Sequence, residues 1–357
     1  MSALAGFARW MWGSRSPAAR AGRMALLPVS ASYRMAIGVR NAAYDAGVLK
    51  SHRLPVPSIG IGNLSVGGTG KTPLTMYVAA ELTRRGLRPG ILLRGYGDDE
   101  TAEHREANPS AVVETGADRH AAAASAVAQG AEVLVLDDAL QRRDATTDVM
   151  LALVAAETWT RARWPLPSGP WREGLGALRR ADAVIVTRKA AGQSEAESLA
   201  RELAPRTRMG VVLVASLEPF ELVPMSGGSA RSPSTLRGRD VMAVAGVGEP
   251  DLFAVPFERL GARVRLVSFG DHHAYTAEDA AWIVATMPRD GVLVTTAKDA
   301  VKLASLWPAG GPECLVARLR VSITAGADAL AELIDRAATR ARHGNPGTTA
   351  VPSARES

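Results

Sequence analysis

A glycine-rich stretch between an apolar run and a helical pattern is the strongest chemical signal in this 357-residue chain. Glycines let successive backbone N–H groups face one anion, and the start of a helix adds partial positive charge there. A lysine at the end of the loop reaches the outer phosphates, and a hydroxyl beside it is placed for Mg²⁺. A glycine-rich turn without a ligand is the alternative. The sequence predicts a nucleotide-binding phosphate loop of Ser65, Val66, Gly67, Gly68, Thr69, Gly70, Lys71 and Thr72, with Ser65 where the usual pattern has glycine and Thr72 on the metal.

Two carboxylates follow a later apolar run. Residues 131–136 read as a strand and lead directly into Asp137 and Asp138. Kinase folds with a phosphate loop place a carboxylate near Mg²⁺ at this point. An aspartate that caps a turn after the strand is the alternative. The combination with Lys71 and Thr72 favours the metal-associated role.

Three further segments carry groups for acid–base chemistry. Asp118 precedes an alanine-rich helical run, where it could accept a proton or cap the helix, and spacing alone favours the cap. Arg172 and Glu173 end a proline-rich loop, where they could neutralise phosphate and join the metal shell, or form an exposed ion pair. Asp271 and His272 follow a strand-like run, and an Asp–His pair can orient an imidazole for proton transfer.

Strand-like and helical runs alternate along the chain, which predicts an α/β fold with a doubly wound parallel sheet. Ligands of such sheets bind at the carboxyl ends of the strands. A stretch rich in serine, glycine and proline interrupts the pattern and separates a smaller second α/β unit, which the helical run 327–342 closes. The predicted divisions are an N-terminal region 1–50, a phosphate-loop domain 51–216, a linker 217–238, a second domain 239–342 and a disordered tail 343–357.

The N-terminal region is basic, with seven basic residues and one acidic residue in its fifty positions, while the whole chain has a net charge of +6. Apolar residues recur at helical spacing from Ser30 to Leu49. No stretch approaches the roughly 20 uncharged apolar residues of a spanning helix. The pattern fits a basic amphipathic helix on an anionic membrane surface, and equally a helix packed on the catalytic domain. The scarcity of aromatic residues argues against nucleic acid, and a lone Cys314 excludes an internal disulfide or a multi-cysteine metal site.

From about residue 44 to residue 303 the chain resembles the tetraacyldisaccharide 4′-kinase family. The matching blocks include the phosphate loop with its Ser65 and Pro73, the segment Asp137–Gln141, and Asp271–Thr276. Three blocks depart from the family pattern: the chain has Ala139 for glycine and Arg142 for histidine, Ala297 for glutamate, and one carboxylate instead of two in residues 116–119.

The resemblance implies a kinase that transfers the γ-phosphate of MgATP to the 4′-hydroxyl of a lipid A disaccharide 1-phosphate, giving the 1,4′-bisphosphate. It implies a peripheral position on the cytoplasmic face of the bacterial inner membrane. Asp118 is the nearest match to the family's base, and His272, oriented by Asp271, matches the histidine that assists it. The other catalytic-face positions match Asp137, Asp138, Gln141, Arg172 and Glu173. The alternative is a membrane-recruited nucleotide switch, an ATPase or GTPase without lipid kinase activity.

Overall fold

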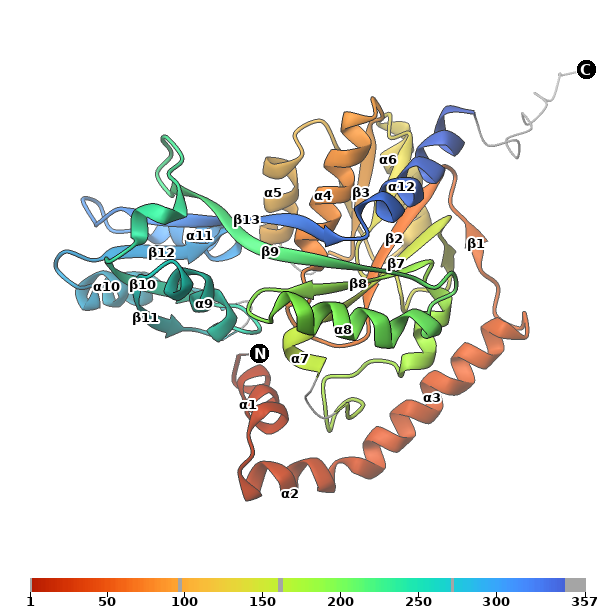
Figure 1. The fold of residues 1–357 in the computed structure, drawn as a ribbon, viewed down its shortest axis with the longest axis horizontal. Helices are drawn as coiled ribbons and strands as arrows, with labels where there is room; N and C mark the ends of the chain where they lie inside the picture. The colour runs from red at the N-terminus through yellow and green to blue at the C-terminus, as the bar shows by residue number, and fades with distance from the viewer. Residues whose placement is uncertain (1, 96–97, 160–162, 271–272, 344–357) are drawn as a thin grey trace, which may run out of the picture.

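The computed structural model describes residues 2–95, 98–159, 163–270 and 273–343. An eleven-stranded sheet in the order β11-β10-β12-β13-β9-β8-β7-β2-β5-β3-β4 runs through both halves of the molecule (Figure 1). Its described neighbours pair in parallel except β13 and β9. The strands are β1 His52–Arg53, β2 Ser58–Asn63, β3 Pro89–Leu93, β4 Val112–Thr115, β5 Val133–Leu136, β6 Ala145–Thr146, β7 Val149–Ala155, β8 Ala183–Arg188, β9 Val211–Pro224, β10 Asp240–Ala245, β11 Arg263–Ser268, β12 Val292–Thr296 and β13 Cys314–Ala325.

Helices cover both faces of the sheet, so the predicted doubly wound α/β fold is confirmed (Figure 1). Strand β5 shows the period-2 rule: Val133 and Val135 join the core under α4 and α12, whereas Leu134 and Leu136 join the core under α6. The α-helices are α1 Ser2–Gly13, α2 Pro17–Ala25, α3 Leu27–Asp45, α4 Lys71–Arg84, α5 Asp98–Ala107, α6 Arg119–Ala128, α7 Ala156–Trp159, α8 Gln193–Leu203, α9 Asp251–Arg259, α10 Ala277–Thr286, α11 Ala297–Leu303 and α12 Ala327–Arg342.

Strands β9 and β13 connect the two halves and differ from the sequence prediction. Regular pattern was expected to end before residue 217, but β9 continues to Pro224 and pairs antiparallel with β13 along most of its length. The irregular backbone follows from Met225 and contains the 3₁₀ turn Pro233–Leu236. Proline and glutamate within 217–224 obscured a strand that its pairing with β13 stabilises.

Helix α12 forms where the sequence predicted it, but it packs against the larger unit. Leu330, Leu333 and Ile334 are buried in the same core as β2, β5 and β7. Three ion pairs, Asp335–Arg85, Arg336–Asp182 and Arg340–Asp148, lie along the same contact. The expectation that this helix closes the second unit was therefore wrong, because β13 carries the chain back across the molecule before α12 begins (Figure 1).

Helix α3 packs one face against the larger unit and exposes the other. Tyr33 Oη donates to the carbonyl of Arg172 at 3.2 Å, and Arg40 donates to the carbonyl of Gln141 at 2.9 Å. Met35 and Val39 stay about two-thirds exposed at 68% and 66%. Helix α3 therefore packs on the larger unit and leaves an apolar face uncovered. None of the helices in the described part of the chain combines the length and hydropathy of a membrane-spanning segment.

A second contact between the halves brings α5 against α11. Lys298 Nζ donates to Glu100 Oε1 at 2.6 Å across it. His104 on α5 is fully buried, and neither ring nitrogen has a hydrogen-bond partner among the described residues. Burial lowers the pKa of His104 from 6.5 to about 4, with the charge of Glu100 opposing this shift and Lys298 adding to it. The neutral imidazole is the form that this contact holds.

The acid stability of the protein should depend on His104. The unfolded chain binds the imidazole proton more readily than the folded protein between pH 6.5 and about 4, so stability falls as the pH falls through that window. We expect His104→Leu to remove up to about 3 kcal/mol of that loss, from 1.36 kcal/mol per pKa unit. Urea unfolding at pH 7.5 and pH 4.5 measures the effect. The exposed His343→Gln control should keep the wild-type slope; equal slopes for all three proteins would contradict the assignment.

Candidate functional site

The phosphate loop joins the end of β2 to the start of α4, as the sequence predicted. Asn63 lies at its base, where Nδ2 donates to the carbonyl of Ser65 at 2.7 Å and to Thr69 Oγ1 at 2.8 Å. Gly70 has a φ of 86°, and a Cβ there would lie 2.4 Å from Leu217 Cδ1. Only glycine fits this entry to the helix. The shape of the loop thus depends on its own backbone and on Leu217 of β9. The sequence had predicted position 217 as the start of a linker.

The Asp137–Asp138 turn lies beside this loop because β5 pairs in parallel with β2. Parallel neighbours end at the same edge of a sheet, which brings the strand-end groups together. The approach is close: a Cβ on Gly62 would lie 2.5 Å from the backbone N of Leu140. Asp138 itself has a φ of 54°, an unusual value for a residue with a side chain. A close approach and a strained aspartate mark this turn as a functional position.

Three charged side chains meet at the mouth of the loop, and we call Lys71, Asp138 and Arg172 the charge cluster. Arg172 Nη1 donates to both carboxylate oxygens of Asp138, at 2.7 and 2.8 Å. Lys71 Nζ lies 3.7 Å from Asp138 Oδ1. All three side chains are largely shielded from solvent. The structure therefore brings together residues that are a hundred positions apart in the chain.

The two aspartates have opposite pKa shifts. Burial by itself would raise the pKa of Asp138, but Lys71 and then Arg172 outweigh it and hold the pKa below its usual range. Asp137 is more deeply buried, and burial raises its pKa above the usual range although Lys71 opposes this. Arg119 Nη2 also donates to the Asp137 carbonyl at 2.7 Å. Asp138 is thus the carboxylate that stays charged in this site. A further cation beside Asp137 would stabilise the charged form of Asp137 and lower its raised pKa.

Glu173 and Gln141 have structural partners. Glu173 accepts from Arg180 Nη2 at 2.8 Å on both oxygens, and from Asn41 Nδ2 at 2.9 Å. Gln141 Nε2 donates to the carbonyl of Asn63 at 2.8 Å, which ties the Asp137–Asp138 turn to the base of the loop. The carboxylate expected to bind metal is therefore occupied by protein donors, and Gln141 positions the turn.

Asp118, one of the two candidate bases, has backbone partners of its own. Asp118 Oδ1 accepts from the backbone N of His120 at 2.9 Å and of Ala121 at 3.1 Å, which makes it the N-cap of α6 and lowers its pKa. Asp271 and His272 lie outside the described residues. The neighbouring His273 has its Nε2 3.1 Å from Asp279 Oδ2 within the second unit.

Mg²⁺ would fit the oxygen donors beside the loop. The Thr72 hydroxyl lies in the first turn of α4, and Asp137 supplies a buried carboxylate at the end of β5, which pairs with β2. Mg²⁺ prefers oxygen ligands and is usually held by one or two protein groups together with substrate phosphates. Among the described residues there is no group of three or more His, Cys, Asp or Glu side chains that could hold a metal ion.

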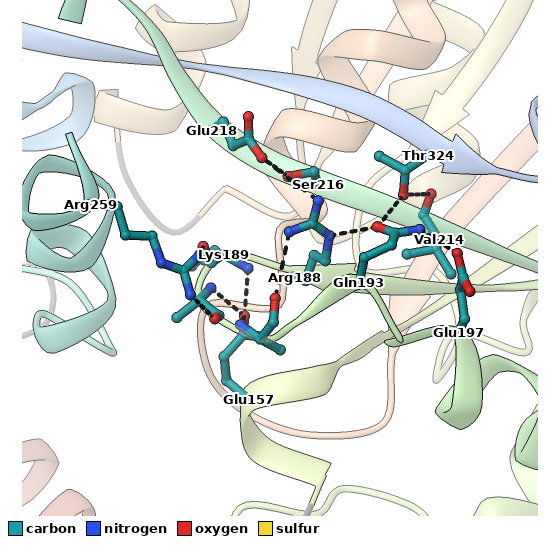
Figure 2. Close-up of polar contacts among 12 residues, drawn as sticks. Glu157, Arg188, Lys189, Gln193, Glu197, Val214, Ser216, Glu218, Arg259 and Thr324 are labelled. Atoms are coloured by element: carbon teal, nitrogen blue, oxygen red, sulfur yellow. Dashed lines mark hydrogen bonds and ion pairs between the residues drawn. The ribbon is translucent and has the colours of Figure 1, made fainter. Parts of the chain in front are cut away.

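Sequence reasoning missed a turn that touches the loop from the other side. Thr187 Oγ1 donates to the carbonyl of Thr69 at 2.9 Å, and Lys189 Nζ donates to the carbonyl of Gly68 at 2.9 Å. Figure 2 shows Lys189 together with Glu157 and Arg259, which hold its backbone. The signal available was a strand, residues 183–187, that ends in a basic pair at the same sheet edge.

A doubly wound sheet with a phosphate loop, a helix-start lysine and threonine, and strand-end aspartates defines the class of nucleotide-dependent phosphotransferases. Within that class, the family description tetraacyldisaccharide-1-P 4′-kinase matches residues 22–339. The chain belongs to this family.

Individual relatives and a solved structure support this family assignment. A tetraacyldisaccharide 4′-kinase of Aromatoleum aromaticum is 34% identical over 354 residues, covering 94% of this chain and 97% of the relative. One of Anaeromyxobacter sp. strain K is 36% identical, covering 92% and 94%. The crystal structure of LpxK from Aquifex aeolicus in complex with ATP is 29% identical, with a TM-score of 0.68, and covers 88% of this chain and 99% of that chain.

Two arginines beside this site should give opposite phenotypes when replaced. Arg180→Met leaves the Glu173 carboxylate buried without its guanidinium, so we expect the free energy of unfolding to fall by about 3 kcal/mol. Arg172→Met should cost about 1 kcal/mol of stability, because its ion pair is less completely buried, and should cost activity instead. Urea unfolding and kinase assays on both variants separate the roles. If the Arg180→Met protein were as stable as wild type and needed more Mg²⁺ for activity, Glu173 would be a metal ligand and not only the partner of Arg180.

Proposed function

We propose that this protein is an ATP-dependent kinase that phosphorylates the 4′-hydroxyl of tetraacyldisaccharide 1-phosphate, giving the 1,4′-bisphosphate. The observation that carries the proposal is the charge cluster at the mouth of the phosphate loop, in a chain that belongs to this kinase family. In phosphoryl transfer the protein mainly positions two substrates and stabilises the charge of the transferred group. A nucleotide switch has no comparable use for Arg172, so the kinase is favoured.

Each residue of the cluster has a role in this reaction. The amides of the loop and Lys71 bind the phosphates of ATP, and Arg172 neutralises charge on the transferred group. Asp138 fixes the position of both cations before the nucleotide arrives. Thr72 and Asp137 would hold Mg²⁺, which would neutralise phosphate charge when bound.

The acceptor hydroxyl is a poor nucleophile, so a base should assist it. Asp118 and the Asp271–His272 pair remain the candidates, and Asp118 would have to exchange its capping role for a role as base. The pair belongs to the second unit and Asp118 to the larger one. We infer that the two units, which the β9–β13 ribbon connects, close over the substrates.

The N-terminal helices are suited to bring the enzyme to its lipid substrate. Phe7, Trp10, Met24 and Met35 are exposed there at 45–68%. A groove between α3 and the segment 163–165 is lined by Leu27, Ala31 and Trp164 together with Arg34 and Arg163, which suits an acyl chain with an anionic head group. We place the protein peripherally on the cytoplasmic face of the inner membrane.

Purified protein with MgATP and tetraacyldisaccharide 1-phosphate should transfer the γ-phosphate of ATP to the lipid. Lys71→Met should lower kcat by about 100-fold or more, because a cation that stabilises the transferred charge is lost. Thin-layer chromatography with γ-labelled ATP measures the product. Lys50→Met, outside the site, is the control. Label release as free phosphate without a labelled lipid would support the nucleotide switch instead.

Binding to anionic vesicles should depend on exposed arginines of the N-terminal region. Replacing Arg15, Arg20 and Arg34 by glutamine should weaken binding by about 100-fold, from about 1 kcal/mol per basic residue near an anionic surface. Co-sedimentation with phosphatidylglycerol vesicles measures this. The matched variant replaces three exposed arginines of the second unit, Arg237, Arg239 and Arg289. Equal loss in both triple variants would mean that only net charge matters.

A further inference from the structure

A second lysine, Lys189, contacts the phosphate loop from outside it. It follows β8 directly, and its Nζ donates to the carbonyl of Gly68 at 2.9 Å. A Cβ on Gly68 would lie only 3.4 Å from this ammonium, so the lysine lies against the loop backbone itself. The phosphate loop therefore has two lysines at hand: Lys71, within the loop, and Lys189, from a turn 118 positions later in the chain.

The Gly68 contact controls one peptide group of the loop. The carbonyl of Gly68 and the N–H of Thr69 belong to one planar unit and point in opposite directions. Here the carbonyl accepts from Lys189, and the N–H donates to the carbonyl of Gly67 at 2.9 Å. A phosphate cradle needs such N–H groups for the anion. If Lys189 released the carbonyl, this peptide group would be free to turn its N–H toward a phosphate.

The turn that carries Lys189 is held in place by a carboxylate. Glu157 Oε1 accepts from the backbone N of Lys189, of Ala190 at 2.8 Å and of Ala191 at 3.1 Å (Figure 2). Burial opposes the charge of Glu157, yet these amides hold its pKa below the usual range. The charged carboxylate of Glu157 thus fixes the backbone of the turn. These hydrogen bonds do not use the ammonium of Lys189.

Arg259 connects the same turn to the second unit. It reaches from the end of α9 and donates to the carbonyls of Lys189, at 3.4 Å, and of Ala190 (Figure 2). The contact lies on the backbone of the turn, so it constrains the position of Lys189 without using its charge. A movement of the second unit would therefore shift this turn and change the contact between Lys189 and the phosphate loop.

A neutral carbonyl is a modest partner for the partly buried Lys189. Burial lowers the pKa of Lys189, although Glu249 and Glu157 oppose the shift. Charge-assisted hydrogen bonds to phosphate oxygens are roughly twice as strong as neutral ones. A nucleotide phosphate next to Gly68 is therefore a better acceptor for Lys189 than the carbonyl that it contacts now.

We propose that Lys189 is a further nucleotide-binding residue, whose ammonium leaves the Gly68 carbonyl to bind a phosphate oxygen of ATP, and that Arg259 is a positioning residue that acts through the Lys189 turn. The proposal rests on the proposed kinase function for the identity of the nucleotide. It adds a second lysine to the phosphate site and a backbone contact through which the second unit affects it.

Nucleotide titrations of the full chain, followed by fluorescence of labelled ATP and by its displacement with ADP and AMP, test this proposal. We expect Lys189→Met to weaken ATP binding about tenfold while AMP, which lacks the outer phosphates, binds as to wild type. Arg259→Ala should weaken ATP about threefold, and the double variant should be no weaker than Lys189→Met alone, because Arg259 acts through Lys189. Arg263→Ala, which removes an exposed ion pair with Asp240 in the same unit, is the control and should bind ATP normally.

Equal weakening of ATP and AMP by Lys189→Met would overturn the proposal, as would unchanged ATP binding. Where Lys189→Met fails to fold, Lys189→Gln, which keeps an N–H donor for the Gly68 carbonyl and removes the charge, gives the same comparison. Additive losses in the double variant would overturn the role of Arg259. A wild-type protein that binds no nucleotide would instead contradict the proposed function, since no lipid acceptor enters this experiment.

Discussion

Asp138 pairs with two cations, Lys71 and Arg172, at the mouth of the phosphate loop. This arrangement is possible only because the surrounding elements hold the three side chains in place. The carboxylate of Asp138 needs β5 beside β2, and a glycine at position 62 so that the turn can approach. Arg172 must come from a proline-rich loop, whose backbone is in turn held by α3 through Tyr33. Removing any of these supports would disturb the pairing of Asp138 with Lys71 and Arg172.

The β9–β13 ribbon and the second unit contact the phosphate loop or the elements near it at three places. The β9–β13 ribbon supplies Leu217, which lies over Gly70 of the loop. Helix α11 meets α5 through Lys298 and Glu100, and Arg259 holds the turn behind the loop. Elements far apart in the sequence therefore converge on one edge of the larger sheet, where parallel strands end. This arrangement lets a movement between the units change the geometry around the phosphates.

The sequence was sufficient for the fold class and for the phosphate-loop and aspartate segments, because these signals are local: glycine spacing, a helix-start lysine and strand-end aspartates. It did not predict β13, the full length of β9 or the packing of α12, since long-range pairing decides these. The partners of Glu173 could not be predicted for a similar reason, because Arg180 and Asn41 approach it only in the folded protein. Lys189 escaped notice because its significance depends on a loop 120 positions earlier. The roles of Asp118, Asp271 and His272 remain proposals.

A crystal structure with Mg²⁺ and a non-hydrolysable ATP analogue would test the central claim most directly. The account predicts phosphates in the loop of residues 65–72, with Lys71 Nζ on a phosphate oxygen and Arg172 still within hydrogen-bond distance of Asp138 or of the outer phosphate. Mg²⁺ should contact Thr72. Triphosphate bound away from Lys71, or Asp138 far from both cations with the nucleotide in place, would contradict the account.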